Sequence, residues 1–539
     1  FILNSIYEPI SLPELTIDQY VWQNISAWQD KVAIVCGATG RKYTYAKLRD
    51  HSAATAIKLQ TKLQTGDVAA VCLPNIPEFA ISVLGILEAG LVVTTINPIY
   101  TAEEISRQLI SSKPKIVFAL AETYKTIKAA AEIAKISIEI VIVKNNNSED
   151  DPSGTINFSQ LISTLDVDFS SLKRNAININ EMSTLLFSSG TTGLPKGVML
   201  SHLNITTNCE MLNAKLPERT LLQPTTNDFQ EVLPSVLPFH HIYGYTVSLL
   251  AKLSLGCKVV TLPKFDPSTF LNSLIEHKAT ILNLVPPIVL FLGGSDKVSE
   301  DHLKYVRMVA SAGAPLGASD ADRFKKKAPQ VEFMQGYGMT ETSALSFLSP
   351  NDCWDYATIG YAASNTQAKV VKLDDSDYVG CDKNEVGELL VRGHNVMKGY
   401  LNNKEATDAA IVKGNWLRTG DMVFYNENGL CYIVDRLKEL IKVKGYQVAP
   451  AELEEILRSH PNIQDAAVIG IAHELYGEIP KAFVVKRKGA TIQENDIHAF
   501  TNKKIVDYKQ LRGGVQFVDS VPKSSTGKIL RRELKKLYC

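Results

Sequence analysis

Residues 188–197 form a run of small and hydroxyl-bearing residues that could bind a polyphosphate. The run reads Ser-Ser-Gly-Thr-Thr-Gly-Leu-Pro-Lys-Gly and directly follows the apolar stretch Thr184–Phe187. Small residues after a strand let backbone N–H groups approach phosphate oxygens, and hydroxyls and one lysine add charge-assisted contacts. It is not a Walker A loop, because Lys196 is followed by Gly197 and Val198. A flexible surface loop is the plainer interpretation, but this composition behind a buried strand argues against it.

Two carboxylates stand beside glycines in positions suited to ligand binding. Gly336 and Gly338 precede Glu341, which suggests a backbone that lies close to a ligand, and magnesium prefers oxygen ligands. Asp421 follows Gly420 in a predicted tight turn, where a carboxylate can accept both hydroxyls of a ribose. Taken alone, either carboxylate would more often be a surface charge.

A lysine and a pair of histidines complete the candidate chemistry. Lys528 ends the segment Ser-Thr-Gly-Lys close to the end of the chain, and the glycine lets its amine swing. His240 and His241 precede Ile242 and Tyr243. A histidine beside an apolar stretch is usually a packing or capping residue, so these two need support from their surroundings.

The elements that must position these residues alternate short β-branched runs with longer helical patterns over the first two-thirds of the chain. This alternation predicts parallel sheets in a layered α/β architecture. We expect helices over Glu78–Ala89 and Tyr124–Ile136. The expected strands are Val68–Pro74, Lys115–Leu120, Ile138–Val143, Met182–Phe187, Lys258–Leu262, Thr280–Leu284 and Val306–Ala310.

The pattern changes twice towards the C-terminus. From Gly387 to Val434 helical patterns become rare and a β-rich section is expected, with strands Glu388–Arg392 and Leu430–Val434. Beyond Arg436 an α+β pattern follows, which predicts a boundary between an N-terminal domain (1–435) and a C-terminal domain (436–539). The expected C-terminal elements are helices Ala451–Ser459 and Glu494–Lys503 and strands Ala466–Ile471, Lys481–Val485 and Val515–Val518.

Composition excludes several classes of partner. Lysine plus arginine equals aspartate plus glutamate at 57 each in 539 residues, so no net charge favours nucleic acid or an anionic membrane. No apolar run approaches the length of a membrane-spanning helix. The eight cysteines show no CxxC spacing, which indicates reduced thiols rather than zinc or redox sites.

These features predict a soluble intracellular protein, and they leave its oligomeric state open. The chain begins at Phe1 rather than Met, so we expect the true N-terminus to be missing, together with any targeting segment. It ends in Lys-Leu-Tyr-Cys, which is not a Ser-Lys-Leu peroxisomal signal. Cytoplasm, peroxisome and mitochondrion are not distinguished.

The loop at 188–197 resembles the phosphate loop of the adenylate-forming superfamily, which contains acyl-coenzyme A synthetases, nonribosomal-peptide adenylation domains and beetle luciferases. Within the superfamily the chain is most similar to the branch of 4-coumarate–CoA ligases and insect luciferase-like fatty acyl-CoA synthetases. Further motifs of the superfamily follow in the expected order: Leu237–Tyr243, Gln335–Thr342, Trp416–Asp421, Asp435–Glu454 and Pro522–Lys528.

The resemblance implies an acid–CoA ligase that uses ATP, Mg²⁺ and coenzyme A. In it Glu341 would bind Mg²⁺, Thr340 would contact the α-phosphate, and Asp421 and Arg436 would hold the ribose. The nucleotide-binding set it implies is Ser188, Ser189, Gly190, Thr191, Thr192, Gly193, Lys196, Gln335, Gly336, Tyr337, Thr340, Asp421, Arg436, Lys438 and Gln447.

The same resemblance assigns the two half-reactions to two lysines of a mobile C-terminal domain. Lys528 would bridge carboxylate and phosphate during adenylation, and Lys442 would serve thioester formation after rotation about a hinge at Lys438. His241 would gate the passage between the acyl site and the coenzyme A tunnel. The implied coenzyme A contacts are Lys264, Lys444 and Gly445.

The acid is predicted from the expected wall of its pocket, at Tyr243, Ala310 and Gly313. The last two are small where many phenylpropanoid ligases carry bulkier side chains, which favours a medium- to long-chain fatty acid. The alternatives are a 4-coumarate-type aromatic acid–CoA ligase and a luciferase-like adenylate oxygenase. A fatty-acyl-AMP ligase and an inactive relative are disfavoured by the intact lysines and carboxylates.

Overall fold

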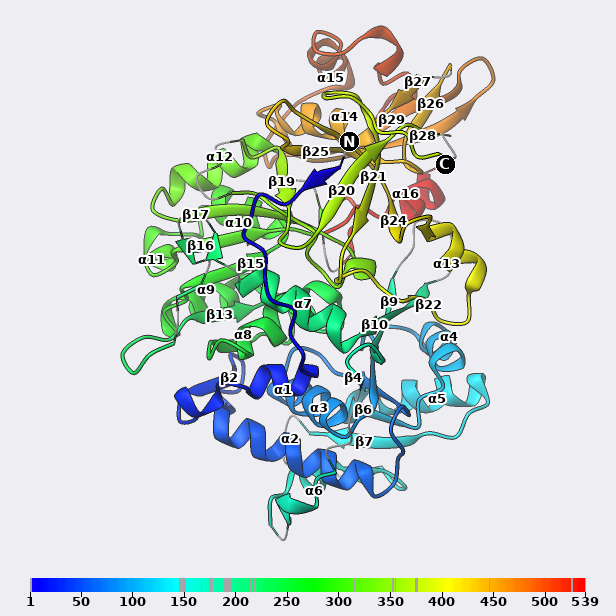
Figure 1. Cartoon of the computed structure of the whole chain (residues 1–539). Helices are drawn as coiled ribbons and strands as arrows, with labels where there is room; N and C mark the ends of the chain where they lie inside the picture. Colours follow the sequence, from blue (N-terminus) through cyan, green and yellow to red (C-terminus); the bar gives the residue numbers. More distant parts are fainter. Residues whose placement is uncertain are drawn as a thin grey trace.

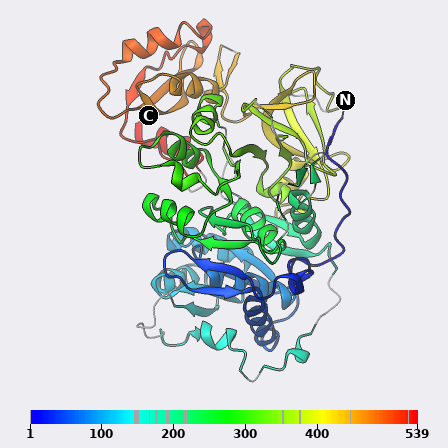
Figure 2. The same ribbon diagram turned by 90° about the vertical axis from the view of Figure 1, so that its left-hand side faces the viewer.

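Layered sheets flanked by helices make up the larger part of the molecule, and a smaller α+β part sits at one end (Figures 1 and 2). The coordinates are a computed structural model. It describes residues 2–144, 152–165, 167–173, 178–188, 195–213, 215–216, 219–220, 222–223, 225–314, 316–350, 353, 355–373, 377–444, 446–524 and 527–538.

The first sheet carries the phosphate-loop candidate. Its central strands are parallel, and the two strands at one edge are each antiparallel to the preceding neighbour. The strand interiors are apolar and almost wholly buried, as expected for a sheet covered on both faces. Its described strands, in spatial order, are β22 (Gly399–Tyr400), β10 (Lys196–Ser201), β9 (Met182–Ser188), β5 (Val92–Thr95), β4 (Val68–Cys72), β6 (Ile116–Leu120), β7 (Glu139–Val143) and β8 (Ile156–Asn157).

Helices on the two faces of this sheet close its core. Every residue of α3 (Pro77–Glu88) is buried, because the helix is apolar around most of its circumference and lies between layers. The helix α2 (Tyr45–Gln60) packs against it, and the short α1 (Ile17–Trp22) contacts it too. On the other face lie α4 (Ala102–Ser112) and α5 (Tyr124–Ala134), whose buried residues form a separate apolar cluster with β4, β6 and β7.

The second sheet brings the other candidate segments to one edge. Strands β15 (Ile281–Leu284), β16 (Met308–Ser311) and β17 (Glu332–Tyr337) are parallel, with Ser311 paired to Gln335. Because parallel strands end at the same edge, the residues after β16 and β17 lie side by side, where α/β sheets commonly bind ligands. The sheet continues through β18 (Phe347–Leu348), β19 (Thr358–Ala362), β25 (Cys431–Arg436), β24 (Trp416–Tyr425), β21 (Gly387–Arg392) and β20 (Gln367–Val371).

The C-terminal part is built on the antiparallel pair β28 (Ile463–His473) and β29 (Gly477–Lys486). Most of its buried apolar side chains form clusters of their own. One small cluster, around Met422, Leu440 and Ala449, joins it to the end of the second sheet. The other described elements are β26 (Ile441–Val443), β27 (Tyr446–Val448), β30 (Val515–Phe517), α14 (Pro450–Arg458), α15 (Glu494–Thr501) and α16 (Arg531–Tyr538).

The predicted fold class is confirmed, with some differences in detail. The expected β-rich section is present, but its strands extend the second parallel sheet instead of forming a sheet of their own. A further described sheet, β3 (Lys42–Thr44), β2 (Val32–Cys36), β14 (Lys258–Thr261) and β13 (Val232–Ser235), includes strands from before Val68 that periodicity did not indicate. Among the described residues, no helix combines the length and apolarity needed to cross a membrane.

Candidate active site

The phosphate-loop candidate connects two paired strands. Lys196, the first residue of β10, lies opposite Ser188, the last residue of β9. The Lys196 ammonium lies over the ring of Tyr400, 4.9 Å from its centroid. The loop is therefore the tip of a hairpin, with its lysine braced by an aromatic side chain. Five predicted phosphate ligands lie outside the described residues: Ser189, Gly190, Thr191, Thr192 and Gly193.

Glu341 lies directly beside this hairpin. It is only 6% exposed, in the 3₁₀ turn η5 (Thr340–Thr342). Its Oε1 accepts hydrogen bonds from Ser188 Oγ at 3.1 Å and from the Tyr400 hydroxyl at 2.9 Å. A buried carboxylate is stable only where donors or a cation meet it, so these two hydroxyls fix the carboxylate within reach of the phosphate loop.

The glycine before Glu341 has a structural role that differs from the predicted one. A Cβ on Gly338 would come within 1.3 Å of the carbonyl oxygen of Ala344, so glycine is required where the chain folds back on itself. At Gly336 an added Cβ would make only ordinary contacts, the nearest at 3.5 Å to Leu345. The close approach at Gly338 is to the protein's own backbone and not to a ligand.

Asp421 sits where three elements meet. Its register partner across β24 and β25 is Arg436, whose Nε lies 3.4 Å from Asp421 Oδ1. The phenol of Tyr337, from β17, donates to Oδ2 at 2.6 Å. Gly420 has a left-handed φ of +71°, but it lies within the continuous strand β24 (Trp416–Tyr425), so the tight turn predicted just before the carboxylate is not formed. Both oxygens are therefore held by donors, which a pair of ribose hydroxyls could share or replace.

Lys528 enters the same region from the C-terminal part. A turn holds it: its backbone N–H donates to Ser524 Oγ at 3.2 Å, and its carbonyl accepts from the Ser524 N–H at 2.8 Å. A Cβ on Gly527 would lie 2.8 Å from Pro287 Cδ, so the turn presses against the start of α10 (Pro286–Gly294) in the larger part.

Several charged side chains surround the Lys528 ammonium. Burial and the charge of Arg436 lower the pKa of Lys528 to about 8, while Glu439, and after it Asp421 and Glu341, oppose the shift. The ammonium thus feels both candidate carboxylates of the larger part. At neutral pH it remains mostly protonated and supplies the positive charge of the site.

The two histidines are neutral at neutral pH. Burial, which removes water from the charged form, lowers the pKa of His240 to about 3 and that of His241 to about 4. The charge of Lys528 adds to the second shift. His241 Nδ1 accepts a hydrogen bond from the Tyr243 backbone N–H at 3.3 Å. The ring proton of the neutral imidazole therefore resides on Nε2, which makes His241 a donor rather than a base on that side.

The predicted acyl wall is more filled than its small residues suggested. The Tyr243 hydroxyl donates to the carbonyl of Ala310 at 3.2 Å and lies 3.4 Å from that of Leu284, so its ring spans the ends of β15 and β16. Gly313 has φ of +89°. Glycine is favoured at this position because side chains rarely adopt such a φ. The ring of Tyr243 lies beside Ala310.

Several predicted residues lie away from this cluster. Lys442 and Gln447 pair across the β26–β27 hairpin and are both exposed. Lys444 lies in the same hairpin, with its ammonium 4.3 Å from the centroid of the Tyr476 ring. Figure 1 places this hairpin at the outer end of the C-terminal part, and Gly445 is outside the described residues. Lys264 is exposed after β14.

The remaining predicted nucleotide contacts lie at the edge of the second sheet or in the connection that follows it. Thr340 is buried beside Glu341. Gln335 is buried too, but its amide donates to the carbonyl of Tyr356, so its side chain is already engaged. Lys438 is exposed in the turn that follows β25.

Sequence reasoning missed the residues that anchor the Lys528 turn. Arg531, three residues later, donates to Glu439 at 2.6 Å and to Glu454 at 2.7 Å. Asp435 accepts from the Ala451 N–H at 2.9 Å, and burial raises its pKa to about 6. These bonds tie the start of α16 and α14 to the connection after β25. Tyr400 was missed as well, because it lies outside the motifs; the preceding Gly399 was the one local signal.

Comparisons with known proteins find matches over nearly the whole chain. The model of the family described as AMP-binding enzyme matches residues 21–401, and that of its C-terminal domain matches 452–528. The chain is 38% identical to 4-coumarate–CoA ligase 1 of Solanum tuberosum over 542 residues, covering 99% of this chain and 95% of that protein.

Solved structures share the fold. ATP-bound MatB from Rhodopseudomonas palustris superposes with a TM-score of 0.83 at 27% identity, covering 97% of this chain and 99% of that one. The anthranilate CoA ligase AuaEII, in complex with anthranoyl-AMP, superposes with a TM-score of 0.87 at 22% identity, covering 98% of each chain.

Proposed function

Because the chain belongs to the AMP-binding enzyme family and is an AMP-forming acid–CoA ligase, we propose that its substrate is a compact aromatic acid of the 4-coumarate type. The observation that carries the site assignment is the position of Lys528, whose turn packs against Pro287 of the larger part, with Glu439, Asp421 and Glu341 among the charges that act on its ammonium. Its surroundings combine a cation, two carboxylates and a hairpin loop suited to phosphates.

In the first half-reaction, a carboxylate oxygen of the acid attacks the α-phosphorus of ATP. The bond to the bridging oxygen breaks, pyrophosphate leaves, and a mixed acid–phosphate anhydride with AMP remains. Negative charge gathers on the phosphoryl oxygens, so preorganised positive charge and donors lower the barrier most. Lys528 supplies the charge between the two reacting groups, Asp421 orients the ribose, and Lys196 and the phosphate loop hold the departing pyrophosphate.

Magnesium fits the environment of Glu341. Among the described residues, both donors to this side chain meet Oε1, which leaves Oε2 for a cation. No group of three or more potential metal-ligating side chains occurs in the described part of the chain. This suits an ion that takes one protein carboxylate and otherwise binds phosphates and water. When bound, Mg²⁺ would neutralise phosphate charge.

In the second half-reaction, the coenzyme A sulfur attacks the carbonyl carbon, AMP leaves, and the thioester forms. We assign this step to a second orientation of the C-terminal part, divided from residues 1–435 at the boundary with 436–539 and hinged at Lys438. The exposed hairpin would then bring Lys442, Lys444 and Gln447 to the site. The exposure of these side chains supports this assignment, since polar side chains at the surface can dock against another part of the molecule.

The choice of acid rests on two observations. The relatives that match over almost the whole chain include 4-coumarate–CoA ligases of Solanum tuberosum at 38% identity. In addition, the Tyr243 ring narrows the space beside Ala310, so the small residue there does not open a long channel. Both favour the aromatic alternative over the fatty acid that the side-chain volumes first indicated.

A substrate panel tests the proposal. Pyrophosphate release and thioester formation should be measured with 4-coumaric, caffeic, lauric and palmitic acids, with and without coenzyme A. We expect the highest kcat/KM with a hydroxycinnamic acid and thioester only when coenzyme A is present. A clear preference for palmitate would reject the aromatic assignment while keeping the reaction type.

A further inference from the structure

The turn that carries Glu341 ends in two residues with unusual backbone angles. Ser343 has φ of +60° and Ala344 has φ of +114°, in the region that residues other than glycine rarely adopt. Both residues are buried. Strained positions of this kind persist only where the surrounding structure enforces them, and they cluster at functional sites. The residues around this turn must therefore hold it in shape.

Two buried asparagine side chains, Asn208 and Asn395, clamp the strained pair from outside. The amide nitrogen of Asn208 donates to the carbonyls of Thr342 and Leu345, at 3.2 and 2.8 Å. The amide nitrogen of Asn395 donates to the same two carbonyls, at 3.4 and 2.9 Å. Thr342 and Leu345 come immediately before and after the strained pair, so four hydrogen bonds fix both of its ends.

The partners of the two amides fix their orientation. A carbonyl oxygen can only accept, so each amide must turn its nitrogen, and not its oxygen, towards the turn. Asn208 Oδ1 accepts from the Leu345 N–H at 3.1 Å. Asn395 Oδ1 has no partner among the described residues, although the side chain is wholly buried. An unpaired buried oxygen is costly, which indicates that the two donations of Asn395 to the turn outweigh this cost.

The clamp joins the Glu341 turn to the phosphate-loop hairpin. Asn208 lies on α7 (His202–Asn213), which starts directly after β10 and lies in the middle of the molecule (Figure 1). Asn395 lies in the connection from β21 to β22, and β22 pairs with β10. In the same connection, the Met397 N–H donates to the carbonyl of Glu341 at 2.8 Å. Both clamp residues are therefore anchored on elements next to β10.

We propose that Asn208 and Asn395 are positioning residues of the adenylation half-reaction. By holding the strained turn they keep the Glu341 carboxylate at the phosphate-loop hairpin, where Mg²⁺ and the phosphates would meet it. A relaxed turn would let the carboxylate shift, and a small displacement of a preorganised group costs much of its effect. This role depends on the proposed function, in which Glu341 is the magnesium ligand.

Binding of an ATP analogue with a methylene group between the α- and β-phosphorus atoms tests this role without turnover. Calorimetric titrations in Mg²⁺ and in EDTA give the gain in affinity that Mg²⁺ provides. We expect Asn208→Ala to reduce this gain about tenfold and Asn395→Ala about threefold, because the Asn395 side chain makes one hydrogen bond fewer to the turn. The affinity in EDTA should match that of the wild type, since metal-free phosphates do not need Glu341.

The substitution Ala344→Gly separates a positioning role from a role in packing. Glycine adopts a φ of +114° without strain, so the turn keeps its shape with less help. Ala344→Gly alone should raise the unfolding temperature and bind the analogue like the wild type. Added to Asn208→Ala, it should restore most of the lost gain, which a packing role for Asn208 does not predict. A double variant that recovers nothing would contradict the positioning role.

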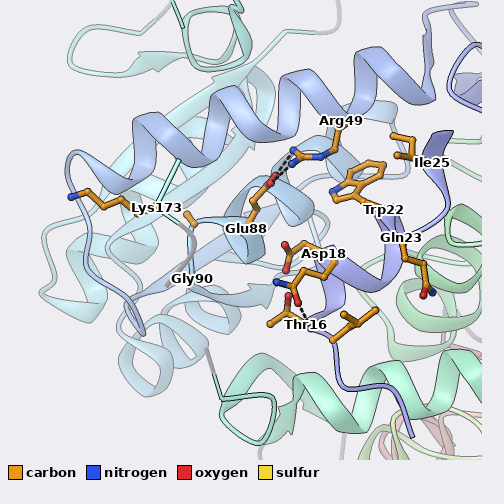
Figure 3. Close-up of a pocket in the computed structure, with 12 residues that line it drawn as sticks. Thr16, Asp18, Trp22, Gln23, Ile25, Arg49, Glu88, Gly90 and Lys173 are labelled. Carbon is orange, nitrogen blue, oxygen red and sulfur yellow. Dashed lines mark hydrogen bonds and ion pairs between the residues drawn. The ribbon is translucent and has the colours of Figure 1, made fainter. Parts of the chain in front are cut away.

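Two controls remove comparable contacts elsewhere. Gln230→Ala removes an amide that donates to two backbone carbonyls, those of Val32 and Gly256, at 2.9 and 2.8 Å. Glu88→Gln weakens the ion pair with Arg49 that Figure 3 shows beside a cavity among the first helices. Both controls should lower the unfolding temperature and leave the gain from Mg²⁺ unchanged. A loss of the gain in these controls too would show a general effect of lower stability and overturn the proposal.

The variant Glu341→Gln distinguishes failure of the clamp from failure of the proposed function. A wild type without any gain from Mg²⁺, or a full gain in Glu341→Gln, would reject Glu341 as the magnesium ligand and the clamp with it. A gain that Glu341→Gln loses but Asn208→Ala and Asn395→Ala retain would reject the clamp alone. Should neither alanine variant fold, Ala344→Gly decides, because an unfolding temperature below that of the wild type would show that the turn is not strained.

Discussion

The C-terminal part presents two lysine-bearing segments to very different surroundings. The Lys528 turn is packed against Pro287 of the larger part, and burial with a nearby arginine lowers the pKa of Lys528 to about 8. In the β26–β27 hairpin the side chains of Lys442 and Gln447 are exposed, and the backbone is bonded within the C-terminal part, as where the Lys442 N–H donates to Glu478 at 2.9 Å.

On the proposed roles of the two lysines, this difference means that one orientation of the C-terminal part would serve one half-reaction. The observed orientation places the Lys528 turn against the larger part and leaves the hairpin of Lys442 away from it. The anchoring bonds of Arg531 to Glu439 and Glu454 hold the Lys528 turn in register with the connection after β25. Mutations of the two lysines should therefore impair different half-reactions.

The largest effect is expected for Lys528→Ala. Removing the preorganised charge should lower pyrophosphate release from ATP and acid on the order of 100-fold or more. Thioester formation from chemically prepared acyl-adenylate and coenzyme A should change little. Lys442→Ala is the matched variant and should show the reverse pattern. If both variants impaired the same half-reaction, the contrast between the two segments would be lost.

The next largest effect is expected for a methyl group added at Gly527, which should impair the half-reaction of Lys528 and spare that of Lys442. Gly527→Ala places a Cβ 2.8 Å from Pro287 at a φ of +78°, so the Lys528 turn must withdraw. We expect adenylation to fall about tenfold, the size of a displaced transition-state contact, and the step from preformed adenylate to be spared. Single-turnover measurement of each half-reaction checks this.

Gly489→Ala is the control for that variant. Gly489 lies in the same part of the chain at a φ of +83°, but an added Cβ meets nothing within 4 Å. It carries the same backbone strain without the clash. Equal loss in the two variants would show that strain, and not contact with Pro287, accounts for the effect.

The pH dependence of adenylation should follow Lys528. Its pKa of about 8 in the free enzyme means that the needed ammonium is lost as the pH rises through that value. We expect kcat/KM for pyrophosphate release, without coenzyme A, to fall by about tenfold per pH unit above the pKa. His241, with a pKa of about 4, does not titrate in this range.

The substitution Lys528→Arg sharpens the assignment, because a guanidinium stays charged to much higher pH. Even with reduced activity, this variant should lose the fall above pH 8. A fall that persists unchanged in Lys528→Arg would assign the titration to another group.

Much of this arrangement was predictable because its signals are local. Strands such as β6 and β9 begin and end within a residue of their predicted bounds, since apolar runs and turn residues mark them. Asp421 and Arg436 lie in motifs, and pairing of β24 with β25 brings them together.

What escaped prediction depends on contacts between distant segments. The Tyr243 hydroxyl reaches the carbonyl of Ala310 across 67 positions, a contact that the side-chain volumes behind the fatty-acid prediction did not take into account. Arg531 finds Glu439 and Glu454 only after the C-terminal part has folded against β25.

The smallest effect is expected at the support of Glu341. Tyr400→Phe removes the hydroxyl that donates to Oε1 at 2.9 Å and leaves the Ser188 hydrogen bond in place. One hydrogen bond to a carboxylate is worth about 1.5 kcal/mol, or roughly tenfold at most, and Ser188 should compensate in part. Adenylation should fall about fivefold, with a raised Mg²⁺ requirement, and thioester formation from preformed adenylate should not change.

Tyr432→Phe is the control, because its hydroxyl donates to a carboxylate in a comparable way, to Asp355 at 2.8 Å, but outside the site. Titrating Mg²⁺ against pyrophosphate release in both variants separates local support of Glu341 from the general loss of a tyrosine hydroxyl that donates to a carboxylate. A shift of the Mg²⁺ requirement in Tyr400→Phe alone ties Glu341 to the half-reaction of Lys528, because a hairpin-based thioester step has no use for that carboxylate. An unchanged Mg²⁺ requirement would show that Glu341 does not act with Lys528 in adenylation.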